Sequence, residues 1–139
     1  MGTTYRAKIS KKNKYWISKH RFFEISHHCM QYKEWKDEYE LLEQQGVDAV
    51  KFDGMPHSTE PGDPTASKGI RKYLLKEKMD LVEKTAHDAE PALEKWILTA
   101  VTNDNVSFEY LKLKMGIPCE RDMYYNRRRK FYWLMDQRM

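Results

Sequence analysis

The sequence has no apolar run long enough to cross a membrane, and it has few cysteines. Its longest nearly apolar stretch, WILTAV at residues 96–101, is far short of the roughly 18 residues that a membrane-spanning helix needs. The amino-terminal segment is basic but lacks the apolar block of a secretory signal. Cys29 and Cys119 are too few for a disulfide framework and have no CxxC spacing. We therefore expect a cytoplasmic protein that does not contact membranes.

Motifs that carry enzymatic chemistry are also missing. The sequence has no phosphate-binding glycine loop and no GxSxG nucleophile elbow. His27, His28 and Cys29 are adjacent, and neighbours on a helix point about 100° apart, so they cannot all face one ion. Cys29 is better explained as a small core residue, and Cys119 either as part of a packed turn or as a thiol whose pKa a helix start lowers. We expect no enzyme, no cofactor and no metal site.

Five carboxylates in the middle of the chain have the spacing of a metal-dependent nuclease cluster or of simple ion pairs. They are Asp80, Glu83, Asp88, Glu90 and Glu94. Lysines lie among them at Lys76, Lys78, Lys84 and Lys95. Opposite charges three or four residues apart on a helix form solvent-exposed pairs worth a few tenths of a kcal/mol each. We favour such pairs over a metal site.

Charge is distributed unevenly along the chain. Residues 1–36 contain nine Lys and Arg against two Asp and Glu, residues 37–118 contain ten against sixteen, and residues 119–139 contain six against three. Basic ends around an acidic middle favour contact between the ends and a polyanion.

Composition and periodicity predict an all-α protein. Residues 1–17 are expected to form a basic disordered tail. Residues 18–45 show helical spacing, with Ser18 as N-cap and Gly46 as the stop, and fit two short helices or one bent helix. Residues 46–63 form a Gly/Pro linker, because the stretch 46–64 holds three of the six glycines and three of the five prolines.

Residues 64–139 are expected to form a helical domain. Asp63 followed by Pro64 is a typical helix start, and the helical repeat continues to about residue 87. Asp88 is the expected cap of the next helix, which the turn at 103–105 ends.

The last third of the chain has the pattern of a helix-turn-helix at residues 107–135. Ser107 can cap a short helix, Gly116 tolerates the positive φ of a turn, and Pro118 prevents the helix from continuing. A longer basic helix then starts near Glu120. A short helix, a glycine-containing turn and a longer helix in this order are typical of a DNA-binding motif.

The final helix has two different faces. With Tyr124 at 0° and 100° per residue, Phe131 falls at −20°, Met135 at +20° and Leu134 at −80°, so we expect these four side chains to pack inward. The opposite face collects Asp122, Tyr125, Asn126, Arg129 and Lys130. Trp133, at 180°, is expected to contact either the amino-terminal helices or a second subunit.

This outward face predicts contacts with double-stranded DNA. The expected base contacts, near the start of the helix, are Arg121, Tyr125, Asn126 and Arg129. The expected phosphate contacts are Arg127, Arg128 and Lys130. The alternative interpretation of the RRRK run is a solvated basic face.

In the order of its elements, the sequence resembles the RinA/ArpU family of phage transcriptional regulators, whose carboxyl-terminal part is similar to the helix-turn-helix of sigma factors. The stretches that carry the resemblance are FFEISHHCMQYKEW, GMPHSTEPGDPTASKGI, VEKTAHDAEPALEKWILTAV and SFEYLKLKMGIPCERDMYYNRRRKFYWLM. The resemblance implies sequence-specific binding upstream of phage late genes, activation of those genes, contact with RNA polymerase and a location at the nucleoid of the bacterial host.

Two other functions stay open from the sequence. One is a phage packaging subunit that recognises DNA in the manner of a small terminase, for which a ring-shaped homo-oligomer would be the sign. The other is a protein-interaction module, such as an inhibitor of a nucleic-acid enzyme, whose basic helix meets an acidic protein groove.

Overall fold

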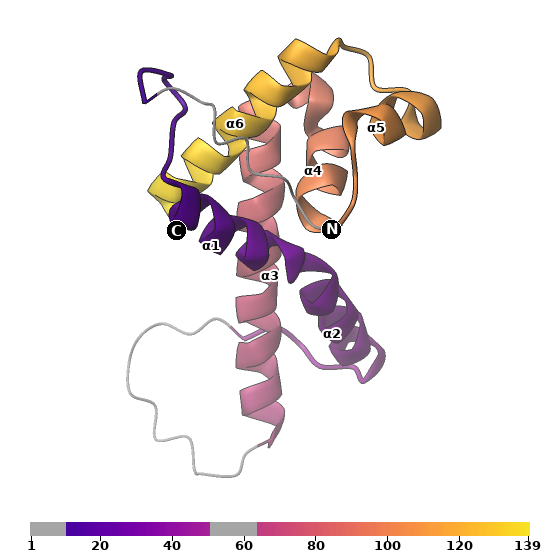
Figure 1. Ribbon diagram of the computed structural model, residues 1–139. Coiled ribbons are helices and arrows are strands. Elements are labelled where there is room, and N and C mark those ends of the chain that lie inside the picture. The colour runs from indigo at the N-terminus through magenta and orange to yellow at the C-terminus, as the bar shows by residue number, and fades with distance from the viewer. Residues whose placement is uncertain (1–10, 51–63) are drawn as a thin grey trace. The chain divides into compact units, whose positions relative to one another are not determined.

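The computed structural model describes residues 11–50 and 64–139, and each regular element in these ranges is helical (Figure 1). In chain order the elements are α1 (Lys19–Met30), α2 (Tyr32–Gln44), α3 (Pro64–Ala89), the 3₁₀ helix η1 (Pro91–Leu93), α4 (Glu94–Thr102), α5 (Phe108–Met115) and α6 (Arg121–Arg138). The prediction of an all-α protein is confirmed. In the described part of the chain, no helix combines the length and the apolarity needed to cross a bilayer.

The chain divides into two compact units. The first unit combines the described residues up to Gln31 with Val82–Met139, and the second unit is Tyr32–Leu81. This partition differs from the predicted one, since the region 18–45 is split at Gln31 and α3 contributes to both units.

The break between α1 and α2 settles the choice between two helices and one bent helix. Ser18 precedes α1 with extended backbone, as expected of an N-cap, although its side chain makes no capping hydrogen bond. Gln31 stands alone between α1 and α2, and its N–H donates to the carbonyl of His28 at 3.2 Å. The region therefore forms two helices.

The second unit has its own small core and a well-satisfied buried cation. Trp35 and Leu75 are buried in it. Lys72 is only 6% exposed, and its Nζ lies 2.6 Å from the carbonyl oxygen of Val47 and 2.6 Å from Oε1 of Glu43. Its ammonium group also lies over the ring of Tyr39, 5.1 Å from the centroid.

The predicted linker begins with residues that make specific contacts. Gly46 follows α2 with a φ of 73°, consistent with its predicted role as a helix stop. The N–H of Val47 donates to Leu42, and the N–H of Val50 donates to Gly69 on α3. The rest of the predicted linker, with the predicted cap Asp63, lies outside the described residues.

The core of the first unit lies where α1 packs against α4 and α6. Buried apolar side chains from all three helices fill it, among them Ile25, Ile97 and Phe131, each 0% exposed. Phe22 of α1 meets Tyr132 of α6 edge to face, with 4.7 Å between ring centroids. Cys29 is fully buried, so its prediction as a core residue is confirmed.

The junction between α3 and α4 corrects one predicted cap. Asp88 is not the cap of a helix, because it lies in the last turn of α3. The break comes at Glu90, whose backbone is extended (φ −168°, ψ 105°) immediately before Pro91. A residue that precedes proline is pushed away from helical conformation, which moves the break two residues beyond the prediction. The turn at 103–105 is confirmed, with Asn103 extended and Asn105 at a φ of 60°.

Candidate nucleic-acid interface

The turn between α5 and α6 is built from the local signals that the sequence carries. The hydroxyl of Ser107 accepts a hydrogen bond from the N–H of Tyr110 at 3.1 Å, as a capping side chain does. Gly116 ends α5 in the left-handed conformation (φ 63°, ψ 41°). Its N–H and that of Ile117 both donate to the carbonyl of Leu111. The buried side chain of Ile117 then fixes the direction in which the chain enters α6.

The buried face of α6 agrees with the angular prediction at three of four positions. Tyr124, Phe131 and Met135 are each at most 1% exposed. Leu134 is half-buried, and Tyr132, at 80° on the same scale, is buried instead. The buried arc is therefore rotated toward α1, whose Phe22 covers Tyr132.

The rotation determines where Arg128 lies. Its angle of 40° places it between the buried Tyr124 and Tyr132. The guanidinium lies over the ring of Tyr132, 5.2 Å from the centroid, and over the ring of Phe22, 5.7 Å from the centroid. Arg128 therefore covers the aromatic core with its charged group, and a phosphate contact would compete with these rings.

Arg127 is held by a carboxylate from a distant part of the chain. Its Nε donates to Oε1 of Glu90 at 2.9 Å, and its Nη1 donates to Oδ1 of Asn126 at 2.6 Å. The hydrogen bond from Arg127 lowers the pKa of Glu90. A predicted phosphate contact and a predicted base contact are thus linked to each other through Arg127.

The start of α6 is fastened to α5. Arg121 forms an ion pair with Glu109, and its guanidinium lies 5.3 Å from the centroid of the Phe108 ring. Tyr125 is half-buried, and its ring meets that of Tyr124 edge to face at 4.9 Å. These contacts orient two predicted base-contacting side chains before any ligand arrives.

Arg129 and Lys130 are half-buried and belong to the outward face of α6. Trp133 lies one turn further along this face, four residues after Arg129 and three after Lys130. Its ring meets Tyr15 edge to face with 5.4 Å between centroids. Trp133 therefore contacts the amino-terminal segment, although the residue concerned precedes α1.

The contact with Tyr15 identifies a part of the surface that the sequence prediction missed. Residues 11–17 were expected to belong to a disordered tail, whereas the N–H of Trp16 donates to the carbonyl of Asn13 at 3.1 Å. The N–H of Tyr15 donates to Oδ1 of the same asparagine at 2.8 Å. Two adjacent aromatic residues inside a basic tail are the signal that could have revealed this turn.

The carboxylates of the chain's middle do not all pair as predicted. Asp80 pairs with Lys76 on the same helix, as expected. Asp88 instead pairs with Arg138 at 2.7 Å, Glu90 with Arg127, and Glu94 with His87. Two carboxylates thus hold arginines of α6, and these pairs span 50 and 37 residues. Residue spacing on one helix cannot predict such contacts.

The described residues contain no group of three or more His, Cys, Asp or Glu side chains placed to hold a metal ion. Burial raises the pKa of the Cys29 thiol to about 12. Burial also raises the pKa of Cys119, which is the reverse of the lowering that a helix start could produce. Both thiols are therefore protonated near neutral pH, which does not favour nucleophilic chemistry at either position.

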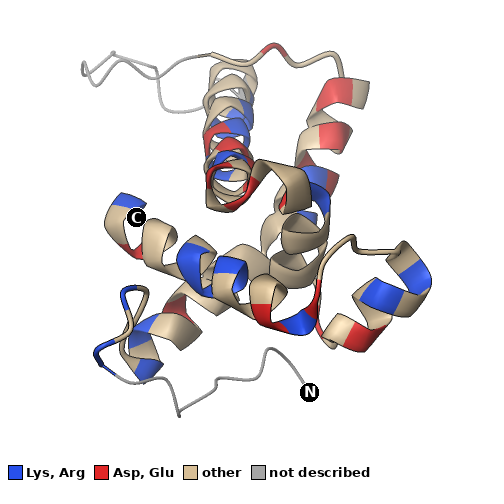
Figure 2. Ribbon diagram, turned by 90° about the horizontal axis from the view of Figure 1, so that it is seen from above, with Lys and Arg blue, Asp and Glu red and all other residues tan. Residues whose placement is uncertain are grey.

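Positive charge dominates α6 (Figure 2). The helix carries six Lys and Arg against two Asp, and four of the basic residues are consecutive at positions 127–130. Of the seven predicted contact residues, Arg121 is exposed and the other six are half-buried. Their stems lie along the helix that closes the core, and their polar groups are fixed by neighbours.

Comparison with protein-family models, with curated proteins and with solved structures found no match. The resemblance to the RinA/ArpU family therefore stays a prediction from the sequence.

Proposed function

We propose that the protein binds double-stranded DNA in a sequence-specific manner, with α5, the Gly116 turn and α6 acting as a helix-turn-helix. The observation that carries the proposal is the division of α6. One side of the helix is buried through Tyr124, Phe131 and Met135. The other side bears basic and amide side chains held at defined positions.

In a helix-turn-helix, the amino-terminal part of the second helix enters the major groove. Arg121, Tyr125, Asn126 and Arg129 are the proposed base contacts, since arginine can pair with guanine and asparagine with adenine. Arg127, Arg128 and Lys130 are the proposed phosphate contacts, which contribute affinity without sequence information.

We further propose that binding serves transcription regulation, with activation of phage late genes near RNA polymerase as the specific form. Support for this step comes from the resemblance of four sequence stretches to the RinA/ArpU family. The site on α6 supports only the DNA-binding step.

Selection of bound fragments from the source genome, with random duplex as competitor, tests the proposal. We expect one sequence class to be enriched and its binding to weaken steeply with salt, because counterions are released from phosphates. Arg129→Ala should reduce discrimination between the selected site and random duplex, whereas Arg128→Ala should weaken both alike. Absence of any salt-dependent duplex binding would contradict the proposal.

One observation favours a second function, that of a protein-interaction module. Leu113 is 82% exposed and Tyr110 is 46% exposed, and their spacing of three places them on the same side of α5. An exposed apolar pair on a basic helix suits a protein groove. Capture of a protein partner by a chain that ignores duplex DNA would favour this function.

A further inference from the structure

A short basic turn next to α6 extends the positively charged surface of the first unit. We call residues 11–16 the N-terminal turn. Lys11, Lys12 and Lys14 are exposed, and the turn contains no Asp or Glu. Two of these lysines lie over aromatic rings of the turn itself, Lys11 over Trp16 at 5.7 Å and Lys14 over Tyr15 at 5.6 Å. The turn is therefore a compact group of cations around two aromatic side chains.

The N-terminal turn is attached to the outward face of α6, beside the proposed reading residues. Tyr15 contacts Trp133, with 5.4 Å between ring centroids. On a helix, residues separated by three or four positions are neighbours. Lys130 and Arg129 are therefore the residues of α6 that adjoin Trp133 on the side toward the start of the helix. The lysines of the turn continue the line of charge that Arg129 and Lys130 begin.

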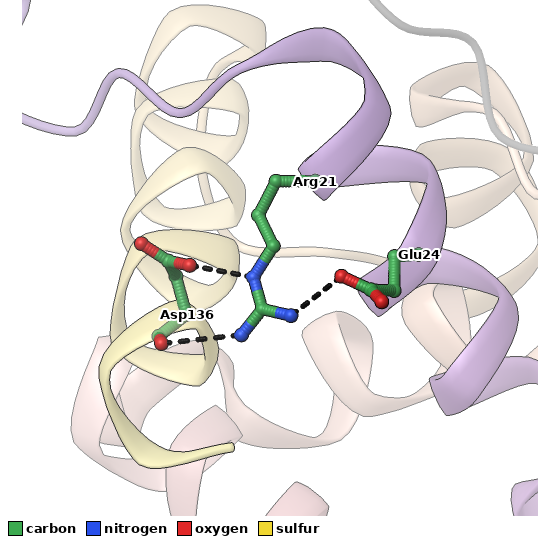
Figure 3. A network of polar contacts seen from close by, with 3 residues as sticks. All are labelled: Arg21, Glu24 and Asp136. Atoms are coloured by element: carbon green, nitrogen blue, oxygen red, sulfur yellow. Dashed lines mark hydrogen bonds and ion pairs between the residues drawn. The ribbon is translucent and has the colours of Figure 1, made fainter.

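A second contact holds the start of α1, which follows the turn, against the end of α6 (Figure 3). Nε of Arg21 donates to Oδ1 of Asp136 at 2.6 Å, and its Nη2 donates to the backbone carbonyl of Asp136 at 3.3 Å. Glu24 accepts from Nη1 of the same guanidinium at 2.6 Å. These bonds raise the pKa of Arg21, so the contact stays charged. The chain on either side of residue 17 is thus tied to α6.

We propose that the N-terminal turn is a second phosphate-binding element, which grips the DNA backbone beside the segment that α6 reads. The proposal rests on the proposed function and adds a partner surface to it. Lysine ammonium groups suit phosphates as point charges. The turn offers three of them on a base that ring contacts hold in place, so little ordering is needed on binding. The sequence preceding the turn adds Arg6 and Lys8.

The test is a triple variant, Lys11→Gln/Lys12→Gln/Lys14→Gln, in the full-length chain. The changed side chains are exposed, and Tyr15 and Trp133 remain, so the fold should be retained. For each phosphate that the variant no longer neutralises, the slope of log K against log salt changes by about 0.9. We expect the slope to become shallower by up to about 2.7 and affinity at 0.15 M salt to fall about tenfold or more. The ratio of specific to random binding should stay the same, because phosphate contacts carry no sequence information.

A matched control, Lys33→Gln/Lys36→Gln/Lys84→Gln, removes the same charge from exposed positions on α2 and α3. Equal slopes for the control and the test variant would overturn the inference, since net charge alone would then explain the effect. A wild-type slope in the test variant would overturn it as well. If the wild-type chain itself shows no salt-dependent binding to duplex DNA, the proposed function fails and the inference fails with it.

A second pair of variants separates anchoring from charge. Tyr15→Ala keeps all three lysines but removes the ring that contacts Trp133, whereas Tyr15→Phe keeps that ring. We expect Tyr15→Ala to weaken duplex binding severalfold and Tyr15→Phe to bind like the wild type. Equal binding by the two variants would show that the contact with Trp133 does not position the turn, which would overturn its role as a built element.

Discussion

The two units use basic residues in opposite ways. In the second unit, the described residues include seven Lys and Arg against eight Asp and Glu. The cations of α3 there are engaged inside the unit, as in the two-bond pair of Arg71 with Glu38 at 2.7 and 2.9 Å. In the first unit, α6 alone carries six basic residues against two acidic ones. A similar number of cations is thus neutralised in one unit and displayed on one helix in the other.

The difference shows that the number of basic residues is a poor guide to function. Lys72 is deeply buried and stabilises the end of α2 by holding Glu43 and the Val47 carbonyl. Arg127 and Arg138 are held by carboxylates too, but these come from the α3–α4 region and leave positions 128–130 between them. Carboxylates at the two sides of α6 therefore fix the helix and leave its middle positively charged.

The largest expected effect comes from breaking the buried face of α6. Phe131→Ala removes a ring that is 0% exposed, and such changes cost about 3–5 kcal/mol. The loss should appear as a lower urea midpoint for unfolding of the first unit. Leu113→Ala is the matched control, because Leu113 is 82% exposed; it should change stability by less than about 0.5 kcal/mol. Equal costs for the two would mean that α6 does not close the core.

A smaller effect is expected from removing the buried cation of the second unit. Lys72→Met keeps most of the stem but leaves the Val47 carbonyl and Glu43 without their ammonium partner. We expect a decrease in stability of about 1–3 kcal/mol, measured by chemical denaturation. Lys76→Met, on the exposed part of the same helix, should cost less than about 0.5 kcal/mol. If Lys72→Met were neutral, the second unit would not depend on internal neutralisation.

The turn before α6 should respond to backbone conformation more than to space. At Gly116 a Cβ atom would meet nothing within 4 Å, but the φ of 63° is unfavourable for most side chains. Gly116→Ala should cost about 1–2 kcal/mol, whereas Gly116→Asn should cost less because asparagine tolerates this region. Gly46, with a φ of 73° and an equally open site, gives the same comparison in the second unit. Thermal melts of the four variants would test this ranking.

The smallest effect on stability is expected at the Arg127–Glu90 pair. The hydrogen bond from Arg127 holds the pKa of Glu90 below its ordinary value of 4.5. The stability that the pair contributes is therefore present above about pH 4.5 and is lost as the pH falls through the lower, folded-state pKa. Glu90→Gln should flatten this part of the stability curve. It should also steepen the salt dependence of DNA binding, because Arg127 gains freedom to reach phosphate; an unchanged curve and slope would argue against both roles.

Signals that lie within a few residues of one another were readable from the sequence. Ser107, Gly116 and the proline after it predicted the turn before α6 because capping and positive φ depend on local chemistry. The helical period placed Tyr124, Phe131 and Met135 inward for the same reason. The predicted contact residues of α6 could be proposed from the sequence, and their function stays a prediction.

Contacts between distant segments could not be read in this way. The cap assigned to Asp88 was wrong because Pro91 sets the break, and its carboxylate is used by Arg138, 50 residues away. Arg128 covers aromatic rings because α1 supplies Phe22. No periodicity within α6 contains that information.

By itself the sequence determined that the chain is helical, where most of its helices begin and end, and that its last helix has one apolar and one basic side. Those properties follow from hydrogen bonding and side-chain spacing along a single segment. Only the tertiary structure decided which cations are neutralised, which are held beside the core, and that a basic turn at residues 11–16 lies on Trp133. Those outcomes depend on which carboxylates and rings arrive from elsewhere in the chain, and packing alone brings them together.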